Sequence, residues 1–396
     1  AFRDVVSNMT LKASYSLTAD RGPASVSNSK AIINSYNTWR PFTSVKESGL
    51  TLSSVENSEL TYEKKHELNI GAEIGFIDNR INIEADWYTR NNFDLIGLIY
   101  TKGTGGQLAK FANVASMKSS GVEFTVSTRN IKTKDFSWNT DFIFSHTKNE
   151  VTDLQSNASV MDMISGNGFA MEGYPVRALF SMDFQGLNEN GYPTFINEKG
   201  QLTVSDINFQ EQLKKDHLVY EGPTDPTMTG SLGNIFRYKG FTLNAFITYS
   251  FGNVIRLDPV FHNVYSDLDA MPREFINRWT TGGDEKVTNV PVIADKRANQ
   301  QDPYLSYAYN AYNYSTERIA KGDFIRMKEL SLSYNFPKKM ISRLKVNDLS
   351  LKIQATNLFL IYSDKKLNGQ DPEFFNTGGV ASPVPRQFTL TLRLGI

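Results

Sequence analysis

Histidines and carboxylates are the side chains in this sequence that could support catalysis or hold a metal ion, because the chain has no cysteine. None of the four histidines has a second histidine at the spacing of an HExxH zinc motif. They are His66, His146, His217 and His262. We interpret each as a loop residue or as part of a polar strand face, and we expect no catalytic centre, no metal and no cofactor.

Two further clusters resemble ligand sites only superficially. The glycine-rich segment 103–106 lacks the Lys-Ser/Thr pair that follows a phosphate-binding loop. Asp258, Asp267 and Asp269 offer the oxygen ligands that calcium prefers, but they lack the spacing of an EF-hand loop. We therefore expect a loop tip at the glycines and solvated carboxylates at the three aspartates.

Segment 252–323 carries a series of five tyrosines among asparagines and serines. They are Tyr304, Tyr307, Tyr309, Tyr312 and Tyr314. A tyrosine ring offers a flat apolar face and a hydroxyl, which suit stacking on a sugar or burial against a partner protein. The same residues could instead pack the segment against its neighbours, so the sequence leaves substrate contact, partner contact and internal packing open.

Charge and hydropathy exclude several classes of protein. The 42 basic residues balance the 42 acidic ones, so no net field attracts nucleic acid, and we expect none as a partner. No apolar run approaches the roughly 18 residues of a membrane helix. The mean hydropathy of −0.37 is still compatible with a β-barrel, in which only alternate strand residues face lipid.

Alternation of apolar and polar residues with period two is the main structural signal. Residues 67–76 alternate leucine, isoleucine, alanine and phenylalanine with polar residues and glycine. Asp78-Asn79 then predicts a tight turn, and residues 81–87 resume the pattern. Polar positions of such strands should face a watery lumen. The acidic residues that we expect there are Glu73, Glu84, Asp86 and Glu123.

The pattern recurs and predicts ten strands, each of about the 9 to 11 residues that cross a bilayer when tilted. Their most regular parts are residues 11–17, 67–76, 81–87, 122–126, 136–144, 232–238, 241–249, 330–334, 349–355 and 388–396. Aromatic residues gather at strand ends. The sequence therefore predicts an all-β protein, a transmembrane antiparallel β-barrel in the outer membrane. A soluble β-sandwich is the alternative for alternating strands.

Connection lengths favour the barrel over the sandwich. Short turns are expected at 77–80, 130–135, 239–240 and 336–347, and long loops at 18–63, 91–120, 148–228, 252–323 and 358–386. Short and long connections alternate strictly, as in outer-membrane barrels with tight periplasmic turns and long outer loops. This parity predicts a periplasmic C-terminus. It also leaves the first strand without a hairpin partner, so we expect further strands upstream of Ala1.

Several segments resemble the SusC/RagA family of TonB-dependent outer-membrane transporters. Any one of these motifs is weak, but together they follow the family's order along nearly the whole chain. The matching segments are 11–18 (LKASYSLT), 57–63 (NSELTYE), 113–115 (NVA), 120–123 (SGVE), 173–175 (GYP), 186–187 (GL), 191–193 (GYP), 324–337 (FIRMKELSLSYNFP), 357–359 (NLF) and 371–373 (DPE).

The resemblance implies a barrel of roughly 22 strands with a plugged lumen. Residues 1–396 would form its C-terminal portion, with the plug domain and earlier strands outside this chain. It further implies energised uptake of large nutrients, oligosaccharides or peptides, with a SusD-like lipoprotein lid and the TonB complex as partners in the outer membrane.

Three other functions remain open from the sequence alone. A TonB-dependent receptor for a siderophore or cobalamin would share the barrel, and a passive porin would share the strand pattern. A small-barrel outer-membrane protease would need aspartates beside His217 and His262. No such pairing is fixed by the spacing of these residues.

Overall fold

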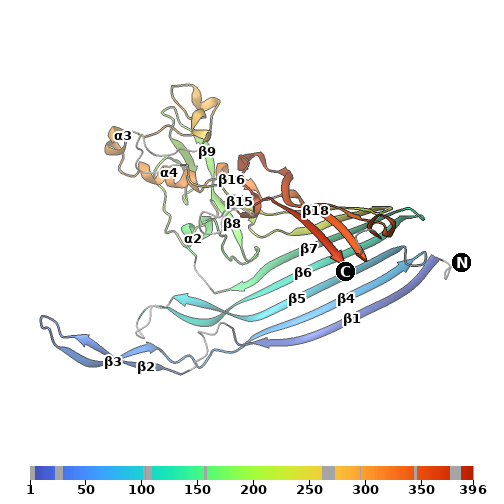
Figure 1. Ribbon diagram of the computed structural model, residues 1–396. Coiled ribbons are helices and arrows are strands. Elements are labelled where there is room, and N and C mark those ends of the chain that lie inside the picture. Colours follow the sequence, from blue (N-terminus) through green and yellow to red (C-terminus); the bar gives the residue numbers. More distant parts are fainter. Residues whose placement is uncertain are drawn as a thin grey trace.

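The computed structural model describes residues 5–22, 30–100, 103, 109–155, 158–260, 273–294, 296–342, 346–374 and 385–395. One antiparallel sheet dominates this part of the chain (Figure 1). It has ten strands, and each strand pairs with the next one along the chain that belongs to this sheet. They are β1 (Val6–Asp20), β4 (Glu63–Phe76), β5 (Ile81–Tyr100), β6 (Ala109–Lys132), β7 (Phe136–Leu154), β13 (Met228–Tyr238), β14 (Phe241–Phe251), β17 (Phe324–Asn335), β18 (Asp348–Ser363) and β19 (Gln387–Gly395).

All ten predicted strands are present in this sheet, and the short connections lie where the sequence places them. Three consecutive residues of the first tight turn, from Ile77 to Asn79, have positive φ angles. That backbone conformation matches the right-handed twist of the strands on either side, and Asp and Asn adopt it more readily than most residues.

The strands are longer than predicted. β5, β6 and β7 have 20, 24 and 19 residues, and most of the expected loop 91–120 is paired strand. Outside the hydrocarbon layer both faces of a strand can meet water, so the alternation that marks a strand in the sequence disappears while backbone pairing continues. Length was therefore underestimated where the membrane no longer constrains the side chains.

The two faces of the sheet differ sharply in polarity. One face carries apolar side chains that are 41 to 70% exposed, and we call it the apolar face. Its members include Leu11, Ile70, Trp87, Ile353 and Leu390. A monomeric soluble protein rarely exposes a continuous apolar surface of this kind. We call the polar face the opposite one. It carries Lys12, Glu73 and Glu84 at the β1 end and Ser231 and Thr248 further along.

The sheet is open at both edges. Within the described residues, β1 pairs only with β4, and β19 only with β18. The free backbone groups of such edges have no partner in a hydrocarbon environment.

The long connections fold into structured elements. The connection between β1 and β4 contains a hairpin of β2 (Ile32–Trp39) and β3 (Lys46–Ser54), which extends away from the sheet (Figure 1). The connection between β18 and β19 contains the 3-10 helices η6 (Lys365–Leu367) and η7 (Pro372–Phe374). Helix α5 (Lys338–Ile341) follows β17.

The connections 155–227 and 252–323 pack together over one end of the sheet, and we call them the loop layer (Figure 1). Its strands are β8 (Ala178–Met182), β9 (Phe184–Leu187), β10 (Pro193–Ile196), β11 (Leu202–Thr203), β12 (Leu218–Pro223), β15 (Val254–Arg256) and β16 (Ile319–Lys321). Its helices are α2 (Val160–Ile164), η2 (Arg273–Asn277), η3 (Asp284–Lys286), α3 (Lys296–Gln301), α4 (Leu305–Asn313) and η4 (Thr316–Arg318).

The loop layer has its own hydrophobic core, which includes Ile164, Met182, Phe195 and Tyr312. These residues come from both connections, so the two segments stabilise each other through shared apolar burial. None of the helices that the structure describes is long and apolar enough to span a membrane.

Candidate functional site

The four predicted lumen residues lie on the polar face. Glu73 is paired in register with Glu84, and Asp86 with Glu123. Lys12 forms an ion pair with Glu73, and its Nζ lies 3.6 Å from Oε1 of Glu84. The repulsion between the two neighbouring carboxylates is thus partly neutralised by a cation on the next strand. That this face lines a lumen stays a prediction.

The tyrosine series divides into buried and exposed members. Tyr309 and Tyr312 are 1% and 3% exposed in the loop layer, where the hydroxyl of Tyr309 donates to the carbonyl of Val292 at 2.5 Å. Tyr314 is partly buried against the core. Tyr304 and Tyr307 remain 61% and 44% exposed, with ring centroids 5.8 Å apart. Their position leaves these two rings available for an external contact.

The three histidines that the structure describes lie on different elements and are not brought together. His66 and His146 lie on β4 and β7 at positions in register with the apolar face, which differs from the expected loop or polar-face location. His66 Nδ1 is 3.1 Å from the hydroxyl of Tyr15. His217 is partly buried in the loop layer, and its burial lowers the pKa of the imidazole. His262 lies outside the described residues.

Of the three acidic calcium candidates the structure describes only Asp258; Asp267 and Asp269 lie outside the described residues, as do Gly105 and Gly106. Across the described ranges, no three histidine or acidic side chains lie close enough together to hold a metal ion.

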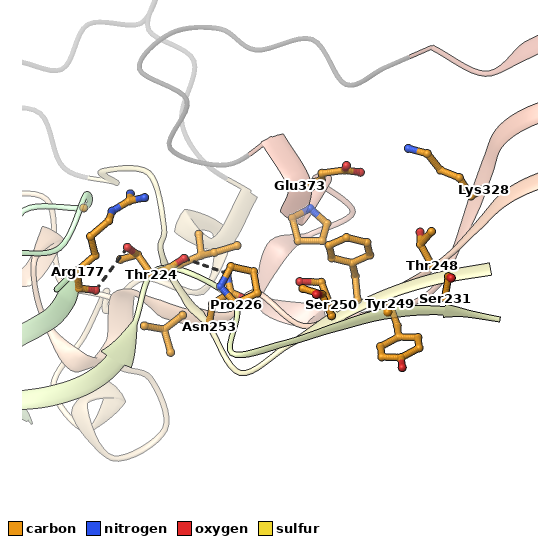
Figure 2. Close-up of a pocket in the computed structure, with 18 of the residues that line it drawn as sticks. Arg177, Thr224, Pro226, Ser231, Thr248, Tyr249, Ser250, Asn253, Lys328 and Glu373 are labelled. Carbon is orange, nitrogen blue, oxygen red and sulfur yellow. Dashed lines mark hydrogen bonds between the residues drawn. The ribbon is translucent and has the colours of Figure 1, made fainter. Parts of the chain in front are cut away.

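Among the described residues, a cavity of about 820 Å³ between the polar face and the loop layer forms a candidate site. Figure 2 shows its labelled side chains: Arg177, Thr224 and Asn253 lie toward one end, and Lys328 lies at the other. Ser231, Thr248 and Ser250 come from the sheet, and Glu373 comes from η7. Tyr249 points to the opposite side of the sheet in Figure 2, although its backbone borders the cavity.

Hydroxyl groups form the floor of this cavity. Thr229 and Ser231 of β13 are paired in register with Ser250 and Thr248 of β14, so four hydroxyl side chains form a compact patch. Ser231 and Ser250 are 8% and 7% exposed. Each hydroxyl can donate one hydrogen bond and accept two, so the patch can bind a polar, uncharged ligand surface.

Two arginines at the cavity are already paired with acids. Arg326 of β17 forms ion pairs with Asp371 and with Glu373, whose Oε2 lies 3.3 Å from Nε. The Nε–Oε2 contact is an ion pair without hydrogen-bond geometry, so Nε of Arg326 makes no hydrogen bond within the described residues. Arg177 binds Asp225 at 2.7 Å. The Arg326 pairs hold the β18–β19 connection against the sheet, whereas the Arg177–Asp225 pair lies within the loop layer.

Two other buried arginines organise the loop layer. Arg256 donates to the carbonyls of Phe180 at 2.6 Å and Ser315 at 2.8 Å, and burial lowers its pKa to about 10. Arg318 pairs with Glu274 at 2.5 Å. Each guanidinium joins segments that are far apart in sequence, so they fix the roof of the cavity by charge-assisted hydrogen bonds.

Sequence reasoning missed this cavity because its walls come from three strands and three connections that are far apart in the sequence. One local signal was available. The strand carries three charged residues within four positions: Arg326, Lys328 and Glu329. Strict alternation puts every second residue on the polar face, so only two of the three charges could lie there. That conflict indicates a β-bulge, and a bulge often marks a functional surface.

Known proteins resemble this chain over most of its length. It is 24% identical to TonB-dependent receptor P3 of Formosa agariphila over 362 residues, which are 86% of this chain and 34% of that receptor. It is 25% identical to TonB-dependent receptor SusC of Bacteroides thetaiotaomicron over 357 residues, which are 86% of this chain and 32% of SusC. The chain thus spans about a third of the length of these curated relatives. No family model matches it.

The fold is also similar to a solved structure of the RagAB peptide transporter, with a TM-score of 0.75 and 22% identity. That match covers 99% of this chain and 41% of the transporter chain. The structure described as the RagAB peptide importer in the open-open state matches with the same TM-score. The predicted resemblance to SusC/RagA transporters and the predicted β-barrel fold are confirmed. The relatives are receptors and transporters, not enzymes.

Proposed function

We propose that this chain forms the C-terminal part of the wall of a TonB-dependent importer of large nutrients, oligosaccharides or peptides, in the bacterial outer membrane. The likeness of 99% of the chain to part of a RagAB transporter chain carries the proposal. The exposed apolar face supports it, because those side chains would meet lipid while the polar face lines a wet interior.

The open edges of the sheet support a larger barrel. Among the described residues, β1 and β19 each have a neighbouring strand on one side only, so the outer edge of each exposes a row of backbone N–H and C=O groups. Backbone groups without a hydrogen-bond partner are costly in hydrocarbon. Further strands would pair with both edges and close a wide lumen. A lumen wide enough for large nutrients needs a plug, and moving that plug requires work supplied through the TonB complex.

In this proposal the C-terminus lies on the periplasmic side and the loop layer lies outside the cell, because outer-membrane barrels have short periplasmic turns and long outer loops. A SusD-like lipoprotein would then close over the outer surface as a lid. Two features offer it apolar contacts: the β2–β3 hairpin, with Trp39 58% and Leu50 75% exposed, and the loop-layer tyrosines Tyr304 and Tyr307. An isolated hairpin of two strands is only marginally stable, so a partner surface would stabilise it.

Two measurements test the proposal. Purification of the affinity-tagged, full-length protein from its native outer membrane should yield a stoichiometric surface lipoprotein. Deletion of the gene should abolish growth on an oligosaccharide or peptide source that supports the parent strain, and an energy-uncoupled strain should show the same loss. Purification without a lipoprotein, combined with TonB-dependent uptake of an iron chelate or cobalamin, would replace the proposal with the receptor alternative.

The tyrosine pair gives a sharper test of the lid surface. Replacement of both Tyr304 and Tyr307 by alanine should reduce the recovery of the lipoprotein, because exposed aromatic rings often dominate the energy of an interface. Replacement of the exposed Leu213 by alanine is a matched control that removes apolar area from another part of the loop layer. Equal recovery from all three proteins would exclude the tyrosines from the interface.

A further inference from the structure

A double irregularity in the sheet places Lys328 at the cavity. On one side of β17, Phe246 pairs with Glu329 and Ile247 pairs with Met327, so Lys328 has no partner on β14. On the other side of β17, Met327 pairs with Phe359 and Glu329 pairs with Thr356. Two residues of β18 therefore lie opposite Lys328 without a register partner on β17. One of these is Asn357, with a φ angle of +52°.

The bulge changes which side chains share a face. Arg326 pairs with Thr248 and Glu329 pairs with Phe246, and both partners belong to the polar face. Lys328 lines the cavity on the same side, as Figure 2 shows. Strict alternation would place Lys328 and Glu329 on opposite faces, so one charge would meet lipid at a large energetic cost. The bulge lets all three charges occupy the polar face.

The three charges differ in their partners. Arg326 is neutralised by two acids, and Glu329 accepts a hydrogen bond from Asn244 at 3.2 Å and lies 3.7 Å from Nζ of Lys352. Lys328 forms no hydrogen bond or ion pair with any residue in the described part of the chain. Glu373, the acid that lines the same cavity, is engaged by Arg326. Among the residues that the structure describes, this partly buried ammonium at the cavity therefore has no counter-ion.

Two other charged residues line the cavity, and both are paired: Arg177 with Asp225, and Glu373 with Arg326. The remaining side chains of the lining are uncharged. Thr229, Ser231, Thr248 and Ser250 supply hydroxyls. The amide oxygen of Asn253 is buried and has no donor within reach, although its nitrogen donates to the carbonyl of Thr224 at 3.4 Å. A ligand that fits here thus needs hydrogen-bonding groups along its body and one negative group at the end near Lys328.

We infer that the cavity binds a short polar oligomer that carries a carboxylate, with the carboxylate on the Lys328 ammonium and the uncharged body on the serine and threonine hydroxyls. The inference rests on the proposed importer function and assigns the substrate class of its lumen. The volume of about 820 Å³ accommodates a few sugar or amino-acid units. A carboxylate paired with a lysine gains a charge-assisted hydrogen bond that a neutral group at the same place lacks.

Equilibrium binding to the full-length protein in detergent tests the inference with two matched pairs of probes. One pair is trigalacturonate and its uncharged methyl ester, and the other is N-acetyl-trialanine and its C-terminal amide. Within at least one pair, the carboxylate form should bind about tenfold more tightly than the neutral form. The pair that shows this preference identifies whether the carboxylate belongs to a uronic acid or to a peptide terminus.

Substitution of the lysine assigns the preference to its charge. Lys328→Gln should reduce the preference to about twofold or less while the affinity for the neutral probe stays unchanged, and Lys328→Arg should retain it. Lys352→Gln is the matched control, because Lys352 is a polar-face lysine on the next strand that does not line the cavity. Retention of the folded-barrel mobility on unboiled gels shows that each variant is assembled.

Two results would overturn the inference: a carboxylate preference that persists in Lys328→Gln, or native protein that prefers neither carboxylate probe. The assay measures binding without TonB or the inner membrane. Loss of nutrient uptake in cells together with an intact Lys328-dependent preference would therefore count against the proposed import function alone.

Discussion

Arg326 of β17 and Asp371 of the β18–β19 connection form an ion pair in which both side chains are nearly buried, at 5% and 13% exposure. The pair fixes a loop to the wall at the edge of the cavity. Asp371→Asn should destabilise the protein by about 3 kcal/mol, because it leaves the Arg326 charge buried without full compensation. Urea unfolding of the full-length protein in lipid vesicles measures this loss.

An exposed ion pair gives the control for that experiment. Lys199 and Asp206 lie 2.8 Å apart with side chains 51% and 61% exposed. Asp206→Asn should change stability much less than Asp371→Asn does, since solvent screens exposed pairs. Equal effects of the two substitutions would show that Arg326 and Asp371 do not form a buried pair in the membrane.

The orientation of the sheet in the membrane is tested by neighbouring residues of β18. Ile353 is 55% exposed on the apolar face, and Gln354 follows it on the polar face. Ile353→Arg should reduce the free energy of folding into lipid by about 2–4 kcal/mol, as expected for a charge near the bilayer midplane. Gln354→Arg should have little effect. A larger loss from Gln354→Arg would reverse the assignment of the two faces.

The partly buried His217 of the loop layer predicts a pH dependence of stability. Burial lowers the pKa of His217 below its ordinary value of 6.5, and the carboxylates of Glu198, Glu211 and Asp216 oppose this effect. The unfolded chain then binds more protons than the folded one below pH 6.5, so stability should fall as the pH drops through that range. His217→Asn should weaken the dependence, as measured by urea unfolding between pH 5 and 8. An unchanged slope would contradict the assignment.

The sequence predicted the sheet because one physical constraint acts on every strand. In the proposed barrel Leu68, Ile70 and Ala72 face lipid while their neighbours face water, and this requirement fixes both the strand and its register. The same constraint predicts that Glu73 and Glu84 share a face. It carries no information about the ends of β5 and β6 within residues 91–120, where the backbone pairing continues without a regular apolar and polar alternation.

The loop layer and the cavity could not be predicted in this way. Phe195 and Tyr312 share a core although more than a hundred residues separate them, and no local pattern pairs them. The burial of Tyr309 likewise depends on a contact that its own helix does not supply, the hydrogen bond from its hydroxyl to the carbonyl of Val292. The bulge at Lys328 is the exception, because three charges in four positions conflict with the alternation around them.

Close packing of a tyrosine over a glycine gives the last prediction. Tyr249 lies across Gly230 on the neighbouring strand, and its hydroxyl donates to the carbonyl of Ile143 at 2.8 Å. A Cβ at Gly230 would overlap both the tyrosine hydroxyl and that carbonyl. Gly230→Ala should therefore destabilise the sheet by about 1–3 kcal/mol, the usual cost of overpacking.

Two companion variants separate the steric effect from the loss of the hydrogen bond. Tyr249→Phe keeps the ring and should cost about 1 kcal/mol. A Cβ at Gly233, on the same strand, would lie 3.5 Å from the ring of Phe246, which is an ordinary contact. Gly233→Ala should consequently be tolerated, with a change within about 0.5 kcal/mol. If Gly230→Ala and Gly233→Ala have the same midpoint of urea unfolding, Tyr249 does not pack over Gly230 in the folded barrel.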